Sequence, residues 1–107
     1  MKRGEVWWVN FDPSIGGETQ KQRPAIIVSN DISNKYINRV QVVPVTSKTD
    51  KLYPSEAPVY IAGKHGKAMA DQVATTSKER LIKLIGNVTQ TEIEAIERAL
   101  KIHLGLP

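Results

Sequence analysis

The period of the hydrophobic pattern changes at Thr89, and this change limits the folds that are open to the chain. Before Thr89, short apolar runs rich in Val and Ile alternate with turn signals, which is typical of strands. After it, four apolar residues recur at helical spacing: Ile93, Ile96, Leu100 and Leu104. Thr89 and Glu92 have the spacing of a capping box, and Gly105 with Pro107 ends the pattern, so one terminal helix is predicted.

The part of the chain before the helix is expected to form five or six short strands. The segments with strand character are 5–11, 25–30, 39–45, 59–62, 67–76 and 78–88. The continuous apolar run at 25–30 predicts a strand buried on both faces, and Pro44 predicts an edge or a bulge. Residues 31–38 form a polar connection with room for one helical turn. The prediction is therefore a mainly β fold, a compact and strongly bent antiparallel barrel with a C-terminal helix.

Length and composition narrow the class of protein. With 107 residues the chain is expected to be one domain, 1–107, and so small a core favours pairing with a second copy. The net charge of +4 favours a polyanionic partner, although many basic proteins share it. The absence of cysteine excludes disulfides and thiolate metal sites and fits the cytoplasm. No apolar stretch approaches ~18 residues and no signal peptide pattern opens the chain, so no membrane span is expected.

The motifs of nucleotide-driven and metal-driven enzymes are missing from the sequence. There is no phosphate-binding loop, no dinucleotide fingerprint, no nucleophile elbow, and no His-x-x-x-His or paired-acid spacing for a metal. His65 and His103 could form an acid–base pair of the kind that cleaves RNA. However, His103 falls in the last helical turn, where a cation complements the helix dipole. His65 is expected in a tight turn at 63–66, where it is more often structural than a ligand contact.

Polar side chains stand at the ends of several predicted strands. Arg23 precedes the second strand, Thr46 and Ser47 follow the third, and Gln72 lies near the end of the fifth, while Glu18 is in the long first loop. Each residue alone has an ordinary structural explanation as a turn or strand-end contact. Together they predict a site at one rim of the barrel. Pro24 would restrict the residue before it to extended backbone and so limit where the arginine can point.

The order of these motifs resembles the MazF/PemK (Kid) family of toxin endoribonucleases. The resemblance rests on "KRGEVWWVNFDPSIGGETQKQRPAIIVSND" at 2–31, "VVPVTS" at 42–47, "ADQV" at 70–73 and the final amphipathic helix. It implies an SH3-like, CcdB/PemK-like barrel that forms a homodimer with an RNA groove across the interface. It also implies sequence-specific, metal-independent cleavage of single-stranded RNA through 2′-hydroxyl attack, with no cofactor, and inhibition by a small acidic antitoxin.

Carried over to this sequence, the resemblance assigns the site. Arg23 and Thr46 match the catalytic residues of the family, with Ser47 beside them, and Glu18 matches its loop glutamate. Gln72 matches a glutamine that is often found near the groove. Three further lysines in the loops expected to flank the groove are predicted to bind RNA: Lys21, Lys48 and Lys51. The loop at 48–54 differs in length and charge between family members, so the resemblance does not extend to the RNA sequence that is recognised.

Two other classes of function remain open from the sequence. The first is a non-catalytic toxin that binds DNA gyrase, as CcdB toxins do on a similar barrel. The second is a small basic RNA-binding module, for which stacking aromatics are needed and are scarce here. A CcdB-like function would not require an arginine and a threonine at opposing strand ends, so this pair favours the nuclease.

Overall fold

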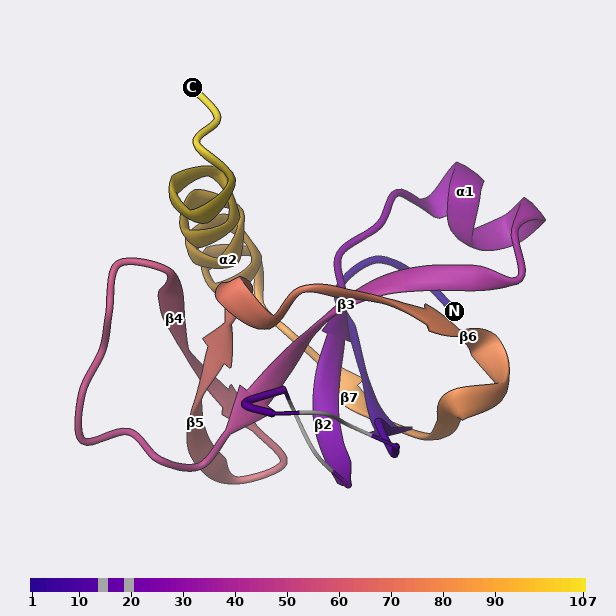
Figure 1. The fold of residues 1–107 in the computed structure, drawn as a ribbon, viewed down its shortest axis with the longest axis horizontal. Helices are drawn as coiled ribbons and strands as arrows, with labels where there is room; N and C mark the ends of the chain where they lie inside the picture. The colour runs from indigo at the N-terminus through magenta and orange to yellow at the C-terminus, as the bar shows by residue number, and fades with distance from the viewer. Residues whose placement is uncertain (14–15, 19–20) are drawn as a thin grey trace.

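The computed structural model describes residues 1–13, 16–18 and 21–107 (Figure 1). Its strands are β1 (Glu5–Asn10), β2 (Gln22–Ile27), β3 (Arg39–Thr46), β4 (Glu56–Ile61), β5 (Lys64–Met69), β6 (Ala74–Ser77) and β7 (Leu81–Asn87). Its helices are α1 (Asp31–Tyr36) and α2 (Gln90–Leu104), with short 3-10 turns η1 (Ala70–Gln72) and η2 (Lys78–Arg80). The single terminal helix and the helical turn after the second strand were both predicted. No helix among the described residues is long and apolar enough to cross a membrane.

The strands form one curled antiparallel sheet in the order β4-β5-β3-β2-β1-β7, with β6 pairing beside β3 (Figure 1). The central strand β3 pairs with β6 through residues 39–42 and with β5 through residues 45 and 46. Pro44 lies where β3 passes from one of these partners to the other, so its missing N–H interrupts neither ladder. The mainly β fold class with a C-terminal helix is confirmed.

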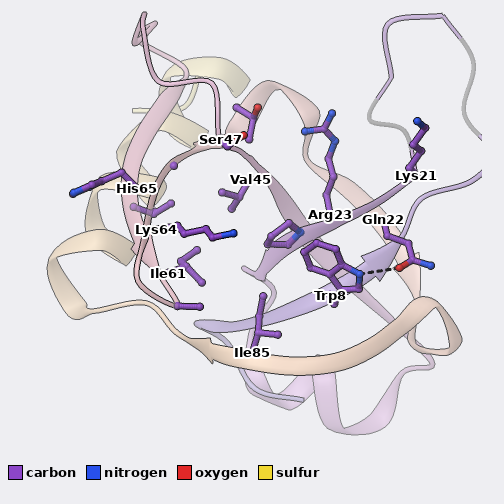
Figure 2. A pocket seen from close by; sticks show the side chains of 15 residues that line it. Trp8, Lys21, Gln22, Arg23, Val45, Ser47, Ile61, Lys64, His65 and Ile85 are labelled. Atoms are coloured by element: carbon purple, nitrogen blue, oxygen red, sulfur yellow. Dashed lines mark hydrogen bonds between the residues drawn. The ribbon is translucent and has the colours of Figure 1, made fainter.

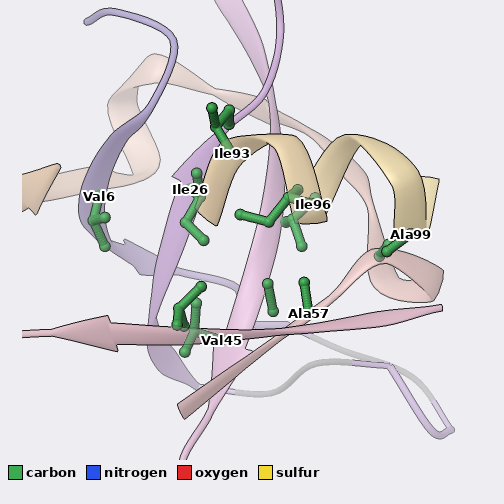
Figure 3. Close-up of a cluster of buried hydrophobic side chains, with 11 residues drawn as sticks. Val6, Ile26, Val45, Ala57, Ile93, Ile96 and Ala99 are labelled. Atoms are coloured by element: carbon green, nitrogen blue, oxygen red, sulfur yellow. The ribbon is translucent and has the colours of Figure 1, made fainter. Parts of the chain in front are cut away.

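Both faces of β2 are buried, as its apolar run predicted. Ile26 packs with Ile93 and Ile96 of α2 in the cluster drawn in Figure 3. Its neighbours Ala25 and Ile27 belong to a second buried cluster on the other side of the sheet. The strand that carries Arg23 is therefore fixed from both sides, which makes it a rigid support for a functional side chain.

The helix α2 begins and ends at the predicted residues. The Thr89 hydroxyl accepts the N–H of Glu92, and Glu92 Oε1 accepts the N–H of Thr89 at 2.8 Å, so the capping box is complete. Glu92 Oε2 also accepts the backbone N–H of Tyr60 at 2.7 Å, which ties the start of the helix to the edge strand β4. Gly105 ends the helix in the left-handed conformation, with φ of 70°.

The hairpin of β4 and β5 differs from the prediction. The sequence placed a turn at 63–66 and one strand at 67–76, and both expectations are wrong. The turn is the two residues Ala62 and Gly63, whose φ angles of 51° and 79° match the tight turn preferred by hairpins. The predicted strand breaks at η1, because β5 and β6 pair with different ends of β3. Residues 64–66, which have weak strand propensity, are held in the sheet by β4.

The second strand also starts earlier than predicted. Arg23 and Pro24 lie inside β2, where they pair with Val9 and Trp8 of β1. The expectation that Arg23 precedes the strand is therefore wrong, because Pro24 does not mark the strand boundary and is accommodated within the pairing of β2 with β1. This shift places the arginine on the sheet itself rather than on a loop.

Candidate functional site

A groove of about 680 Å³ lies beside the N-terminal end of β2, the C-terminal end of β3 and the β4–β5 hairpin. Figure 2 shows the side chains around it, with the Arg23 guanidinium extending toward the end where Ser47 lies. Its polar lining consists of Lys21, Gln22, Arg23, Thr46, Ser47, Lys64 and His65. No Asp or Glu is among the described residues that line it. Three lysine and arginine side chains without a carboxylate in the lining favour an anionic ligand.

Arg23 is half-buried and has an unsatisfied donor. Its Nε is buried and has no hydrogen-bond acceptor among the described residues, and none of the described ion pairs includes it. A buried polar donor without a partner costs about 1–3 kcal/mol, more for a charged group. The guanidinium fork can donate two parallel hydrogen bonds to two oxygens of a phosphate or carboxylate. A guanidinium without an ion-pair partner among the described residues is chemically suited to bind an anion in the groove.

Thr46 and Ser47 bring two hydroxyl groups to the same groove. Thr46 is the last residue of β3 and is 8% exposed, and its Oγ1 accepts the backbone N–H of Lys48 at 3.3 Å. Because a hydroxyl carries one donor and two acceptor positions, this contact leaves the Thr46 proton free to donate. Ser47 is exposed and is the first residue of the following loop. The predicted convergence of Arg23 with these two residues is therefore what the structure shows.

The position of Thr46 depends on Gly66 in the neighbouring strand. A Cβ atom at Gly66 would lie 2.9 Å from the carbonyl oxygen of Thr46 and 3.0 Å from Val45 Cγ1. Contacts below 3.0 Å to backbone do not occur without movement of one of the strands. Glycine is therefore required for β5 to approach the functional end of β3.

We expect Gly66→Ala to destabilise the protein by about 1–3 kcal/mol, the usual cost of overpacking. The free energy of unfolding in urea measures this change. The matched control is Gly86→Ala in β7, where a Cβ would meet nothing within 4 Å and φ is not in the left-handed region. Equal stability of the two variants would contradict the steric role of Gly66.

Lys64 and His65 also line the groove, and neither was predicted as a site residue. In Figure 2 the Lys64 side chain points into the groove, whereas the His65 ring points away from it. His65 packs on Tyr60, with 4.7 Å between the ring centroids. The register of the β4–β5 hairpin places Lys64 and His65 beside the groove. Local sequence signals did not indicate this register. His103, the other histidine, is exposed in the last turn of α2.

Lys21 stands at the rim of the groove and closes the base of the first loop. Its N–H donates to Asp12 Oδ1 at 2.8 Å, and its carbonyl oxygen accepts the N–H of Phe11 at 2.7 Å. Its φ of 61° lies in the left-handed region, which is uncommon for a lysine and is sustained here by these two hydrogen bonds. The loop thus leaves β1 and enters β2 at a fixed geometry.

Glu18 and Gln72 do not line this groove. They border a separate cleft of about 360 Å³ together with Asp71 and Arg80. Gln72 Nε2 donates to the carbonyl oxygen of Gly17 at 3.2 Å and so connects η1 to the first loop. The expectation that these two residues share one rim with Arg23 is therefore wrong, because η1 carries Gln72 to the other cleft.

Lys48 and Lys51 are exposed in the loop 47–55, which starts at the groove with Ser47. Neither side chain lines the groove. In the described part of the chain, no group of three or more His, Asp and Glu residues is placed to hold a metal ion. The pKa of Asp31 is lowered, first because the N–H of Arg3 donates to its Oδ1 at 2.7 Å, but Asp31 lies outside the groove.

The chain is similar to known proteins in both sequence and fold. The sequence model of the PemK-like, MazF-like toxins of type II toxin-antitoxin systems matches residues 2–104. Endoribonuclease MazF9 of Mycobacterium tuberculosis is 41% identical over 99% of this chain and 98% of its own length. A MazF crystal structure from Deinococcus radiodurans superposes with a TM-score of 0.88 at 26% identity, covering 99% of this chain and 97% of the other. The structure of an endoribonuclease from a mycobacterial species, solved with its cognate antitoxin, superposes with a TM-score of 0.84 at 28% identity. The match covers 100% of this chain and 97% of the other.

Proposed function

The chain belongs to the PemK-like, MazF-like toxin family of type II toxin-antitoxin systems, and from this premise we propose that it cleaves single-stranded RNA in the groove that holds Arg23. The observation that carries the proposal is the half-buried Arg23, whose Nε has no hydrogen-bond acceptor among the described residues and which lines the same groove as Thr46 and Ser47. The related Endoribonuclease MazF9 supports the choice of RNA over a gyrase contact or simple binding.

The reaction needs no external nucleophile. The 2′-oxygen of the cleaved nucleotide forms a bond to the adjacent phosphorus while the bond from phosphorus to the 5′-oxygen of the next nucleotide breaks. The 2′-hydroxyl loses a proton and the leaving 5′-oxygen gains one, which yields a 2′,3′-cyclic phosphate and a 5′-hydroxyl. The enzyme has to align these atoms, handle the two protons and neutralise charge on the phosphorane.

The groove offers groups that neutralise charge on the phosphorane and protonate the leaving oxygen, and solvent water takes the proton of the 2′-hydroxyl. An arginine guanidinium stays protonated at physiological pH, so it is a poor base and a good charge stabiliser. In the proposal, Arg23 donates to two phosphorane oxygens, and it relays a proton to the leaving oxygen. Thr46 and Ser47 donate further hydrogen bonds to the phosphate. Removal of one such donor from a preorganised site costs about 10²-fold or more in rate.

The remaining predicted residues, together with Lys64, are assigned to binding of the RNA on either side of the cleaved bond. Lys21 and Lys64 line the groove, and we assign them to the phosphates there. Lys48 and Lys51 extend this basic surface along the loop 47–55, and Glu18 and Gln72 are assigned to nucleotides that reach the second cleft. A run of cations along a single strand is the usual source of affinity for its phosphates.

The partner in the cell is proposed to be an acidic antitoxin, and the place of action the cytoplasm. The related mycobacterial endoribonuclease was solved with its cognate antitoxin. A groove lined by cations would attract an acidic, partly disordered segment that folds as it binds and that competes with RNA. The association rate should therefore fall as salt rises.

A homodimer through β7 would bring the groove to the interface. In the described sheet β7 pairs only with β1, and two large apolar side chains on it, Ile82 and Leu84, are 52% and 45% exposed. Ile85 of the same strand lines the groove. A second copy seated on β7 would cover this apolar surface and continue the groove across both copies.

We expect Leu84→Glu to convert a dimer into a monomer, because a carboxylate cannot be buried there without a partner. Size-exclusion chromatography with light scattering measures the molecular mass. The matched control is Ile102→Glu on α2, which is also exposed and lies outside β7. A dimer that survives Leu84→Glu, or a monomeric wild-type protein, would rule out this interface.

The direct test of the function is digestion of a mixed single-stranded RNA by the purified protein in excess EDTA. The proposal expects cleavage at a recurring short sequence. Gyrase inhibition without RNA cleavage would support the CcdB-like alternative, and RNA binding without cleavage would support the binding module.

A further inference from the structure

A buried lysine lies directly across from the functional end of β3. Lys67 of β5 pairs with Thr46 of β3 and is 8% exposed. Its Nζ donates to Glu56 Oε1 at 2.9 Å and to the carbonyl oxygen of Lys51 at 2.7 Å. The side chains of Lys67 and Glu56 are each 9% exposed, so this is a buried ion pair.

The pair holds the backbone of the loop 47–55 at several points. Glu56 Oε1 also accepts the N–H of Tyr53 at 2.9 Å, and the N–H of Glu56 donates to the carbonyl oxygen of Tyr53 at 2.9 Å. Lys67 Nζ lies 5.4 Å from the centroid of the Tyr53 ring, within the range of a cation–π contact. The side chains of the ion pair therefore bind two backbone groups of the loop, the carbonyl oxygen of Lys51 and the N–H of Tyr53, and the backbone N–H of Glu56 binds a third.

Apolar packing does not fix this loop. Its two large apolar side chains, Leu52 and Tyr53, are 56% and 55% exposed. A buried ion pair is a poor source of stability, because desolvation of both charges offsets their attraction and an apolar pair is often as stable. What the ion pair does supply is one defined position for the loop, through directional hydrogen bonds.

The loop 47–55 connects the groove to two exposed lysines. It starts at Ser47, which lines the groove, and the N–H of Lys48 donates to Thr46 Oγ1 at 3.3 Å. It also carries Lys48 and Lys51, both exposed. Movement of this loop would displace both lysines and the hydrogen-bond partner of the Thr46 hydroxyl.

We propose that Lys67 and Glu56 form a buried tether that positions the loop 47–55 for binding of the RNA backbone next to the cleaved phosphate. They are positioning residues, since they act through the loop and not on the reacting atoms. The part of this proposal that concerns RNA binding rests on the proposed RNA cleavage. The part that concerns the loop, namely that the ion pair fixes its position, does not depend on which substrate the protein uses.

The test uses the double variant Lys67→Met with Glu56→Leu, which removes both charges and leaves apolar side chains in their place. Removal of Lys67 alone would leave a buried carboxylate unpaired and is expected to impair folding. The double variant should fold, as circular dichroism and a cooperative thermal transition would show. Lys101→Met, an exposed lysine in the last turn of α2, is the matched control.

The first readout is limited digestion with trypsin, followed by mass spectrometry of the nicks after Lys48 and Lys51. We expect both bonds to be cut at least about 10-fold faster in the double variant than in the wild type or in Lys101→Met, since nicking follows local opening. Unchanged nicking in a folded double variant would overturn the tether.

The second readout is the kinetics of RNA cleavage. The tether positions a binding loop, so KM should rise by about 10-fold with kcat changed by less than about threefold. Faster nicking with an unchanged KM would overturn the positioning role. If the wild type cleaves no RNA, the proposed function fails, while faster nicking in the double variant would still support a tether that fixes the loop.

Discussion

Arg23→Ala should lower cleavage of single-stranded RNA by about 10²- to 10³-fold and leave the fold intact. This is the scale for loss of one preorganised donor to a developing negative charge. The fold should survive, because the guanidinium has no ion-pair partner among the described residues and its Nε has no hydrogen-bond acceptor. Initial rates on a defined oligonucleotide, together with thermal unfolding of the variant, measure both parts of the expectation.

Two further variants test whether activity depends on the planar guanidinium of Arg23 and on its position in the groove, and not only on a positive charge. Arg23→Lys keeps the positive charge and loses the planar fork, so it should restore little of the lost activity. Arg39→Ala removes an exposed arginine at the other end of the sheet, outside both clefts, and should keep wild-type activity. A folded Arg23→Ala protein that cuts RNA at the wild-type rate would remove Arg23 from the mechanism.

An RNA that carries a single 2′-deoxynucleotide on the 5′ side of the cleaved bond should resist the enzyme at that position. The 2′-hydroxyl is the proposed nucleophile, so its removal takes away the attacking oxygen. The substitution leaves the phosphate and the bases in place, so binding should be nearly unchanged. Gel analysis of cleavage and competition with the all-ribose oligonucleotide measure the two properties. Cleavage of the deoxy substrate at the normal rate would require a nucleophile from the protein or from water.

The elements with strong local signals were predicted well. The helix α2 was located from the Thr89 and Glu92 capping pair and from Gly105, because capping depends on neighbours in sequence. The burial of β2 on both faces followed from its unbroken apolar run. The β4–β5 hairpin was misplaced, since residues 64–66 are held in the sheet by pairing with β4 and not by their own propensity.

The candidate site was predicted in part, for a similar reason. Arg23 converges with Thr46 and Ser47 because β2 and β3 are adjacent and antiparallel, so the start of β2 lies beside the end of β3. Gln72 reaches a different cleft, because η1 interrupts the strand between β5 and β6, which both run antiparallel to β3, and no sequence signal marks that interruption. Lys67 was not singled out either, since its partners Lys51 and Glu56 are brought to it only by the sheet register and the loop.

The chemical identity of the product ends tests the central claim most directly. The wild-type protein is incubated with a single-stranded oligonucleotide in excess EDTA, and both fragments are identified by mass spectrometry. We expect undiminished cleavage, a 2′,3′-cyclic phosphate or its hydrolysed 3′-phosphate on one fragment, and a 5′-hydroxyl on the other. Cleavage that EDTA abolishes and magnesium restores, with a 5′-phosphate on the downstream fragment, would contradict it.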